Sequence, residues 1–188
     1  MDVRCNMRAS VALICLAVTL LCGCDQKTVA YGFEIKNVTV NRGYQSIDVH
    51  LKQDMSLSQQ ALEALQHGVA LTIRLDLELR NDSNMIVVRR EARRFQIHYQ
   101  ALIDRYQLID EEKETQQTFS RLRHVFAAID NLDVHVSTGP LPSGNYELRT
   151  RIRLEEGLLP APMQLPAMFS PEWQHDSGWS VWPFKVSV

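Results

Sequence analysis

Residues 69–80, VALTIRLDLELR, form the stretch that decides the fold of this chain. Every second residue is apolar, and the residues between them are small or polar. Because successive side chains of a strand point to opposite faces, this period of two predicts a long strand with one buried face. The apolar positions are Val69, Leu71, Ile73, Leu75, Leu77 and Leu79.

Further alternating stretches lie on both sides of this strand. Phe33–Val40 changes phase near Lys36-Asn37, which predicts a β-bulge, and the apolar positions 47, 49 and 51 mark the next strand. Turn residues separate most stretches, so antiparallel pairing is expected. The sequence therefore predicts a mainly β fold, an antiparallel two-layer β-sandwich that is immunoglobulin-like in general architecture. The later predicted strands cover residues 85–94, 95–103, 132–136, 146–154 and 179–188, the last with a phase change at Pro183.

Two short helices interrupt the strands. Residues 56–68 carry an apolar stripe at helical spacing, a capping box of Ser56 and Gln59, and Gly68 as a C-cap. Residues 119–129 have the same spacing. Four prolines between positions 158 and 182 predict an extended crossing loop there. Residues 110–118 are read as a charged hairpin tip, since they lack the ligand spacing of an EF-hand.

Composition limits the possible classes of protein. The 188 residues are 45% hydrophobic and 22% charged, with a net charge of −2. Such a chain is not disordered overall and has no excess of basic residues, so we expect no nucleic-acid partner. Its length suits a single domain with its own core, and the sequence leaves the oligomeric state open.

The first residues read as a targeting signal. Arg4 and Arg8 precede an uncharged, mostly apolar run of about 14 residues, short of the roughly 20 that a transmembrane helix needs. Leu21-Cys22-Gly23-Cys24 resembles a lipobox, in which the last thiol receives the lipid. We therefore expect residues 1–23 to be a lipoprotein signal peptide, residues 24–32 a lipidated tether, and residues 33–188 one domain. The alternative is an uncleaved short anchor with an incidental cysteine.

Lipidation would also fix the location of the protein. Acyl chains such as palmitate on Cys24 would anchor it in a bacterial membrane. Asp25 resembles a signal for retention at the inner membrane, which predicts the periplasmic side of that membrane over the outer membrane. The other three cysteines lie within the predicted signal peptide, so the mature domain has no disulfide and no cysteine metal site.

Several segments resemble an uncharacterised proteobacterial lipoprotein family, catalogued as a domain of unknown function with the number forty-three ninety. The resemblance covers almost the whole mature chain and implies no activity or cofactor. Because members are often encoded beside a membrane sensor kinase, it implies an accessory role in envelope signalling. The segments are the lipobox, FQIHYQALIDRY at 95–106, LPAP at 159–162, and the tail positions Trp173, Ser177-Gly178-Trp179 and Trp182.

No motif for catalysis or metal binding stands out. His50 and His135 lie in similar Asp-Val-His stretches without metal-ligand spacing, so we expect exposed histidines on a polar face. His175-Asp176-Ser177 has the residue types of a hydrolase triad, but adjacent side chains of an extended chain point apart, and a polar turn is expected. The sequence thus predicts no catalytic residue, no metal and no cofactor, and hence no enzyme.

Arginines are the first candidate for binding, at 15 against 5 lysines. Arg149, Arg151 and Arg153 would line one face of a strand roughly 7 Å apart. Together with Arg89 and Arg90 they could contact an anion, because guanidinium groups pair bidentately with oxyanions. The alternative is a solvated sheet face in which Asp76, Glu78 and Glu147 are cross-strand partners.

Aromatic residues of the tail are the second candidate. An exposed apolar patch there would dock a partner or the bilayer. The alternative is a segment that closes one end of the sandwich and buries its tryptophans. The candidate residues are Phe169, Trp173, Trp179 and Trp182.

Three functional classes follow. The leading one is a lipid-anchored, non-enzymatic periplasmic adaptor that docks a protein partner, such as a membrane sensor or an envelope complex. The second is a carrier of a lipid or other apolar ligand between the sheets, which would need a cavity rather than a close-packed core. The third is an enzyme, for which the sequence gives no reason. The residues expected to line a carrier cavity are Leu71, Ile73, Leu75 and Ile97.

Overall fold

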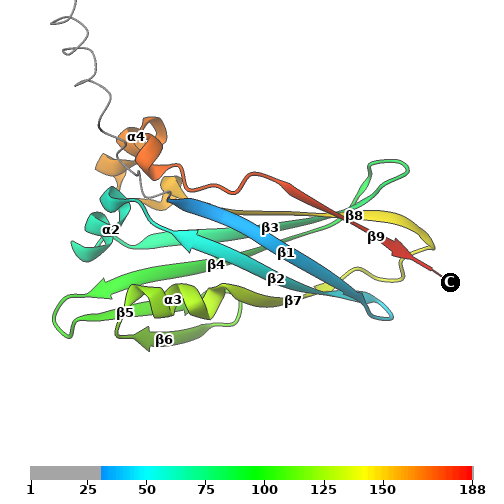
Figure 1. The fold of residues 1–188 in the computed structure, drawn as a ribbon, viewed down its shortest axis with the longest axis horizontal. Coiled ribbons are helices and arrows are strands. Elements are labelled where there is room, and N and C mark those ends of the chain that lie inside the picture. The colour runs from blue at the N-terminus through cyan, green and yellow to red at the C-terminus, as the bar shows by residue number, and fades with distance from the viewer. Residues whose placement is uncertain (1–30, 188) are drawn as a thin grey trace, which may run out of the picture. The chain divides into compact units, whose positions relative to one another are not determined.

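The computed structural model describes residues 31–187, which form two antiparallel sheets packed face to face (Figure 1). The predicted mainly β, two-layer sandwich is confirmed. One sheet has the order β6-β5-β4-β3-β8-β9, and the other has the order β1-β2-β7. The predicted signal peptide, the lipidation site Cys24 and most of the tether lie outside the described residues. The strands are β1 Gly32–Arg42, β2 Ser46–Ser56, β3 Leu71–Asn81, β4 Val87–Gln100, β5 Arg105–Asp110, β6 Thr115–Phe119, β7 Asn131–Ser137, β8 Gly144–Leu154 and β9 Ser180–Val186.

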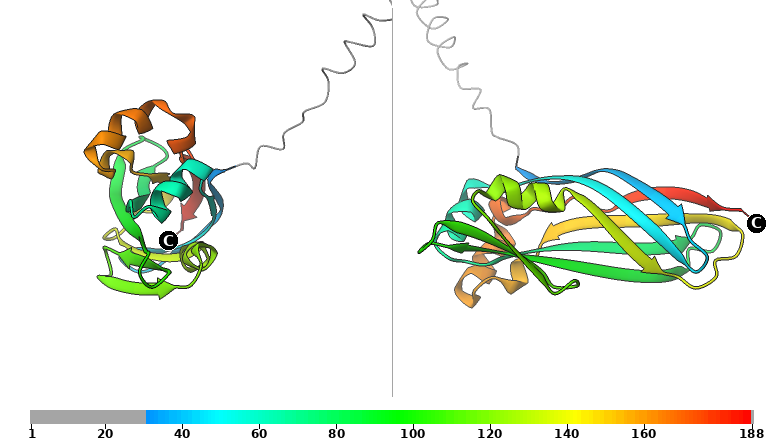
Figure 2. Two further views of the ribbon diagram at one scale, coloured as in Figure 1. Left: turned by 90° about the vertical axis from the view of Figure 1, so that its left-hand side faces the viewer. Right: turned by 90° about the horizontal axis from the view of Figure 1, so that it is seen from below.

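β3 lies in the middle of the larger sheet, between β4 and β8. Leu71, Ile73 and Leu75 are completely buried, as the alternation predicts. They belong to one core with the inward residues of β2, such as Ile47 and Leu51. Since each buried leucine or isoleucine contributes roughly 1.5–3 kcal/mol, this strand fixes the core between the two layers (Figure 2).

β1 and β2 form the hairpin that the sequence predicts. Their register shifts between Ile35 and Asn37, which confirms the bulge at Lys36. The bulge lets Phe33 and Ile35 reach the core while the phase of the strand changes after them.

β4 is one strand of 14 residues, whereas the sequence predicted two. The inward positions include the charged Arg93, which is buried and pairs with Asp110. Because a charged residue at an inward position interrupts the alternation of apolar residues, the sequence pattern predicted two strands where the structure has one. Ile103, predicted as part of a strand, lies in the turn to β5 with 59% of its surface exposed.

The structure contains three short α-helices in its described part, not two. α2 (Gln59–Gln66) is capped by Ser58, whose hydroxyl accepts from the Ala61 N–H at 3.1 Å, and not by Ser56 as predicted. Gly68 follows it with a φ of +90°, as expected for a C-terminal cap. α3 (Leu122–Ile129) is the second predicted helix.

The predicted extended loop in the tail is helical, which corrects the sequence analysis. It contains the 3-10 turn η1 (Glu156–Leu158), the helix α4 (Ala161–Phe169) and the 3-10 turn η2 (Pro171–Trp173). Most of its prolines lie at or before the first turn of an element, where no backbone N–H is needed. Pro166 is the exception inside α4.

Two smaller differences concern the ends of the larger sheet. Residues 115–118, predicted as part of a charged loop, and Phe119, predicted as the start of the second helix, form the edge strand β6. β9 is the opposite edge, as expected, but it shows no phase change at Pro183. Trp182, Phe184 and Val186 stay on the more buried side throughout, and Pro183 is tolerated because β9 is an edge strand.

Candidate functional site

The outer face of the larger sheet is built by the same alternation that buries the leucines of β3. The polar positions 74, 76, 78 and 80 of β3 all point away from the core. The pairing register sets Arg74 between Arg94 of β4 and Arg153 of β8, and Glu78 between Arg90 and Arg149. We call this surface the arginine face. Its guanidinium groups belong to Arg74, Arg80, Arg90, Arg94, Arg149, Arg151 and Arg153, and its carboxylates to Asp76, Glu78, Glu147, Glu155 and Asp176.

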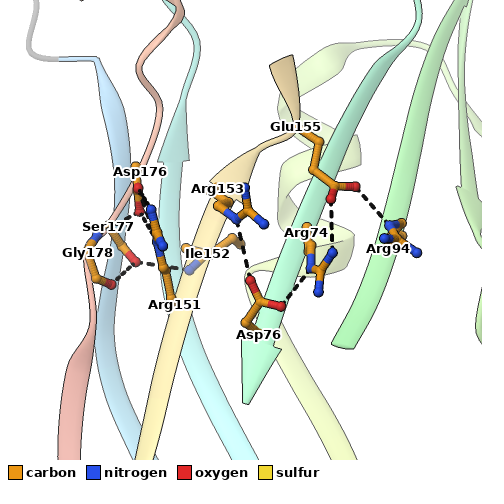
Figure 3. A network of polar contacts seen from close by, with 10 residues as sticks. All are labelled: Arg74, Asp76, Arg94, Arg151, Ile152, Arg153, Glu155, Asp176, Ser177 and Gly178. Atoms are coloured by element: carbon orange, nitrogen blue, oxygen red, sulfur yellow. Dashed lines mark hydrogen bonds and ion pairs between the residues drawn. The ribbon is translucent and has the colours of Figure 1, made fainter. Parts of the chain in front are cut away.

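One end of the arginine face is a chain of ion pairs across three strands (Figure 3). The Glu155 carboxylate accepts from Arg74 Nη1 at 3.2 Å and from Arg94 Nε at 2.8 Å. The Asp76 carboxylate accepts from Arg74 Nε at 2.6 Å and from Arg153 Nε at 3.4 Å. Arg74 therefore links two carboxylates, and the guanidinium groups lie around them.

At the other end, Glu78 is the central acceptor. Its side chain is only 7% exposed, and it accepts from Arg90 Nε at 2.8 Å and from Arg80 Nε. Arg149 Nη1 lies 3.6 Å from the same carboxylate. One carboxylate thus faces three guanidinium groups, and these retain most of their hydrogen-bond donors.

Trp179 and Asp176 complete the face beside β8. Arg151 Nε donates to both oxygens of Asp176, at 2.9 and 3.1 Å (Figure 3). The guanidinium carbon of Arg149 lies 4.9 Å from the ring centre of Trp179, and that of Arg151 lies 6.0 Å away. An aromatic ring with 39% of its surface exposed therefore stands beside two cations.

Three carboxylates of this face, those of Glu78, Glu155 and Asp176, are held in the ionised form by their arginine partners. For Glu78 and Glu155, burial raises the pKa, but hydrogen bonds from their arginine partners outweigh it and lower the pKa overall. The hydrogen bond from Arg151 lowers the pKa of Asp176. In the same way, the hydrogen bond to Asp76 raises the pKa of Arg74, which keeps it cationic.

Positive charge is in excess on the arginine face, because it has seven guanidinium groups and five carboxylates, counting Glu147, which the register sets opposite Arg80. Within residues 31–187, Arg80, Arg90, Arg94 and Arg153 reach their carboxylates through Nε. Their terminal Nη groups remain able to donate to an added oxyanion. The side chains of Arg90 and Arg94 are 70% and 40% exposed, so a ligand can reach them.

The structure brings together four of the five arginines proposed for anion contact. Arg149, Arg151, Arg153 and Arg90 lie on the arginine face, and Asp76 and Glu78 are cross-strand partners as the alternative reading held. Arg89 lies opposite the inward-facing Leu79 and pairs with Glu91 instead. Neighbouring residues of a strand point to opposite faces, so Arg89 and Arg90 cannot share a site.

The four aromatic candidates of the tail do not form one patch. Trp173 is buried in the core, and the half-buried Trp182 donates from Nε1 to the Thr150 hydroxyl at 3.0 Å. Trp179 belongs to the arginine face, whereas Phe169, 80% exposed, ends α4. The tail is helical, and this separates the four residues. An extended loop could have presented them as one continuous patch.

The histidines include one surprise. His50 and His135 are exposed, as expected, and their Nδ1 atoms lie 2.7 Å from Asp133 and Asp48 across the β2–β7 pair. His175, expected in a polar turn, is completely buried, and its Nε2 accepts from the backbone N–H of Ser58 at 2.9 Å. Its polar neighbours gave no sequence signal for this burial.

A second polar centre surrounds the buried pair of Arg93 and Asp110. Arg93 Nε lies 3.3 Å from Asp110 Oδ1, and its Nη1 donates to the Asp133 carbonyl of β7 at 3.3 Å. Hollows of about 190 and 200 Å³ adjoin Arg93, and both are also lined by Lys113 and Asp133. None of the four leucine and isoleucine residues expected to line a carrier cavity borders either hollow, and all four are completely buried in the core.

Residues 31–187 contain no helix of the length and apolarity needed to cross a membrane. The same residues contain no cluster of three or more histidine, cysteine or acidic side chains suited to a metal ion.

These features define a two-layer antiparallel β-sandwich protein whose larger sheet carries an arginine-rich outer face. The chain belongs to the family described as Domain of unknown function (DUF4390), whose model matches residues 30–183. This confirms the family indicated by the sequence. No curated protein and no solved structure matches the chain.

Proposed function

We propose that this protein is a non-enzymatic, lipid-anchored module of the bacterial envelope that docks an acidic segment of a protein partner on its arginine face. The observation that carries the proposal is the excess of guanidinium groups on a flat sheet surface, with terminal donors left for a ligand. Envelope location is supported by the lipobox at Cys24 and, for the periplasmic side of the inner membrane, by Asp25.

A protein partner fits this surface for three reasons. The rows of β8 repeat at roughly 7 Å, which is also the repeat of carboxylates at alternate positions of an extended peptide. Arginine and tryptophan are the residues most enriched at the energetic centres of protein interfaces, and Trp179 stands beside Arg149 and Arg151. The guanidinium groups are already oriented by Asp76, Glu78 and Glu155, so less side-chain entropy is lost on binding.

The test uses the neighbouring residues Arg89 and Arg90 as a matched pair. Arg90→Glu reverses a charge on the arginine face, while Arg89→Glu makes the same change on the opposite face. Binding of a fluorescent peptide with alternating glutamates is measured by anisotropy, at low and at physiological salt. We expect Arg90→Glu to weaken binding at least tenfold, and Arg89→Glu to change it less than twofold, with affinity falling as salt rises.

The same pair then identifies the partner in the cell. A photo-crosslinking amino acid at position 90, in the full-length acylated protein, should capture one envelope protein, and the same amino acid at position 89 should not. Equal capture at both positions, or equal peptide affinity of the two charge variants, would contradict docking on the arginine face.

A carrier of an apolar ligand is the weaker proposal. The core residues expected to line its cavity are completely buried, and the hollows beside Arg93 are lined in part by charged side chains and are small for a lipid chain. Lipid that co-purifies in stoichiometric amount with the detergent-free protein, detected by mass spectrometry, would favour it over the adaptor.

A further inference from the structure

The helical tail contains an uncharged, exposed apolar surface. Residues 157–171 include no charged side chain. Within this stretch, Leu158 is 58% exposed, Leu165 68%, Met168 61% and Phe169 80%. We call these four side chains the α4 patch. Large apolar residues exposed together on a short helix mark a surface that contacts something other than water.

This surface is held in a defined shape. Leu159, Ala167 and Trp173 are buried and fasten the segment to the core at three points. Gln164 Nε2 donates to the carbonyls of Gly157 and Leu159, at 3.0 and 2.8 Å, and so ties η1 to α4. The exposed side chains are therefore presented by an anchored helix and not by a loose loop.

The α4 patch lies at the end of the sandwich where β1 begins (Figures 1 and 2). η2 packs there against α2, and the Ser58 hydroxyl donates to the Glu172 carbonyl at 2.6 Å. The ring of Tyr31, the first described residue, lies 5.4 Å from that of His175, just after η2. The chain that leads from the predicted anchor thus enters the domain beside the tail.

The length of the tether limits how far this end can lie from the membrane. Six residues lie between Cys24 and Tyr31, and even when this segment is fully extended its seven Cα–Cα steps span at most about 25 Å. An acyl chain on Cys24 would therefore keep the bilayer surface within reach of the α4 patch. Among the partners that could contact the α4 patch, the bilayer is the one that the tether keeps near this end of the sandwich.

We infer that the α4 patch inserts into the headgroup region of the bilayer that holds the Cys24 lipid, as a second contact of the protein with its membrane. This inference rests on the proposed lipid anchor. The absence of charge in residues 157–171 lowers the cost of insertion, and leucine, methionine and phenylalanine side chains are suited to the boundary between headgroups and acyl chains. Such insertion would orient the sandwich and leave the arginine face free beside the membrane.

The experiment places an environment-sensitive NBD probe on a unique cysteine at Met168 or, as the control, at Ile86. These residues are 61% and 60% exposed, and the turn that contains Ile86 lies at the opposite end of the sandwich (Figure 1). The variants Met168→Cys and Ile86→Cys are purified as acylated full-length protein and reconstituted in phosphatidylethanolamine–phosphatidylglycerol vesicles with a nitroxide-lipid quencher. The acylated Cys24 carries no free thiol to react with the probe.

We expect a blue-shifted emission and strong quenching at position 168, and neither change at position 86. Probes in water at both positions, on a protein whose intact mass shows the acyl groups, would overturn the inference and leave the anchor and the adaptor proposal standing. An intact mass without acyl groups would remove the anchor and the inference together. Peptide binding at the arginine face is measured separately, so its loss with a quenched probe at 168 would contradict only the docking proposal.

Discussion

His175 shows how one buried residue connects distant segments. Its ring lies against Tyr31 and Phe33 of the N-terminal strand region, and its Nε2 holds the backbone N–H of Ser58 at the start of α2. Because Nε2 accepts this bond, the ring is neutral with its proton on Nδ1. Burial lowers the pKa of His175, so the folded state resists protonation.

Stability should therefore depend on His175 at mildly acidic pH. The contribution is fully present above the unfolded pKa of about 6.5 and is lost as pH falls toward the lower pKa of the folded state. We expect His175→Ala to lower the free energy of unfolding by about 3 kcal/mol at pH 7, since it leaves a cavity and an unpaired N–H. Urea unfolding at pH 7 and 5 measures both effects. The exposed His124→Ala is the control and should change little.

Asp130 has the opposite effect on the pH dependence of stability from that of His175. Burial and the charge of Asp54 raise its pKa to about 6, and its Oδ1 is buried with no partner among the described residues, as is Gln53 Oε1. A carboxyl whose folded pKa is raised stabilises the fold below its unfolded pKa and loses that contribution as pH rises through about 6.

Asp130→Asn should thus stabilise the protein at pH 7, by up to about 3 kcal/mol, because it removes a poorly solvated charge. The gain should shrink as pH falls to 4, which thermal unfolding across this range would show. Asp54→Asn, a change at an exposed neighbour, should give a smaller gain. Loss of stability in the Asp130→Asn variant at pH 7 would instead show that the Asp130 carboxylate is stabilised by a partner in the folded state.

At the scale of elements, β3 follows its sequence most closely. Its inward residues are buried as the alternation predicts, and its outward residues carry the arginine face. The predicted extended loop of the tail differs most from the structure, because prolines near the starts of α4 and η2 are compatible with helical turns. β4 was predicted only in part. Its strand character was predicted, but the burial of Arg93 was not, because it depends on the ion pair with Asp110 on the neighbouring strand.

Adjacent substitutions in β3 test the two faces. Leu75→Asp puts a charge into the core at a completely buried position and should abolish soluble folding. Sequence alone predicts that Arg74→Ala is nearly neutral; the structure revises this to a loss of about 1 kcal/mol, because Arg74 bonds both Asp76 and Glu155. Circular dichroism measures whether each variant is folded, and urea unfolding measures the free energy of unfolding of each variant that folds. Equal tolerance at both positions would refute the sandwich.

For the molecule as a whole, protonation of the carboxylates at acid pH would leave the positive charges of the arginine face unbalanced. Its carboxylates Glu78, Glu155 and Asp176 have lowered pKa values in the folded state. Groups of this kind contribute stability that is present above their unfolded pKa of about 4 and is lost as pH falls through their folded pKa. Protonation leaves the guanidinium groups facing one another without counter-charges.

We therefore expect the melting temperature to fall steeply below pH 4, and added salt to restore part of it by screening the arginines. At pH 7 salt should have little effect on stability. Arg90→Gln removes one cation from the arginine face and should make the fall of the melting temperature below pH 4 smaller. Arg89→Gln should leave this fall unchanged. An acid transition that is insensitive to salt and to Arg90 would show that other groups cause it. Calorimetry at two salt concentrations decides this.

The class of fold, the bulge at Lys36 and the common face of Arg149, Arg151 and Arg153 could be predicted from the sequence. These features follow from local geometry, since side-chain alternation along a strand needs no knowledge of its neighbours. The family was indicated separately, by the resemblance of several segments. The tertiary structure was needed to show that β3 joins Arg90 to Arg149 through Glu78, that Arg90 and not its neighbour Arg89 shares their face, and that His175 is buried. Strand order and the burial of polar atoms depend on partners from distant parts of the chain, which no local pattern contains.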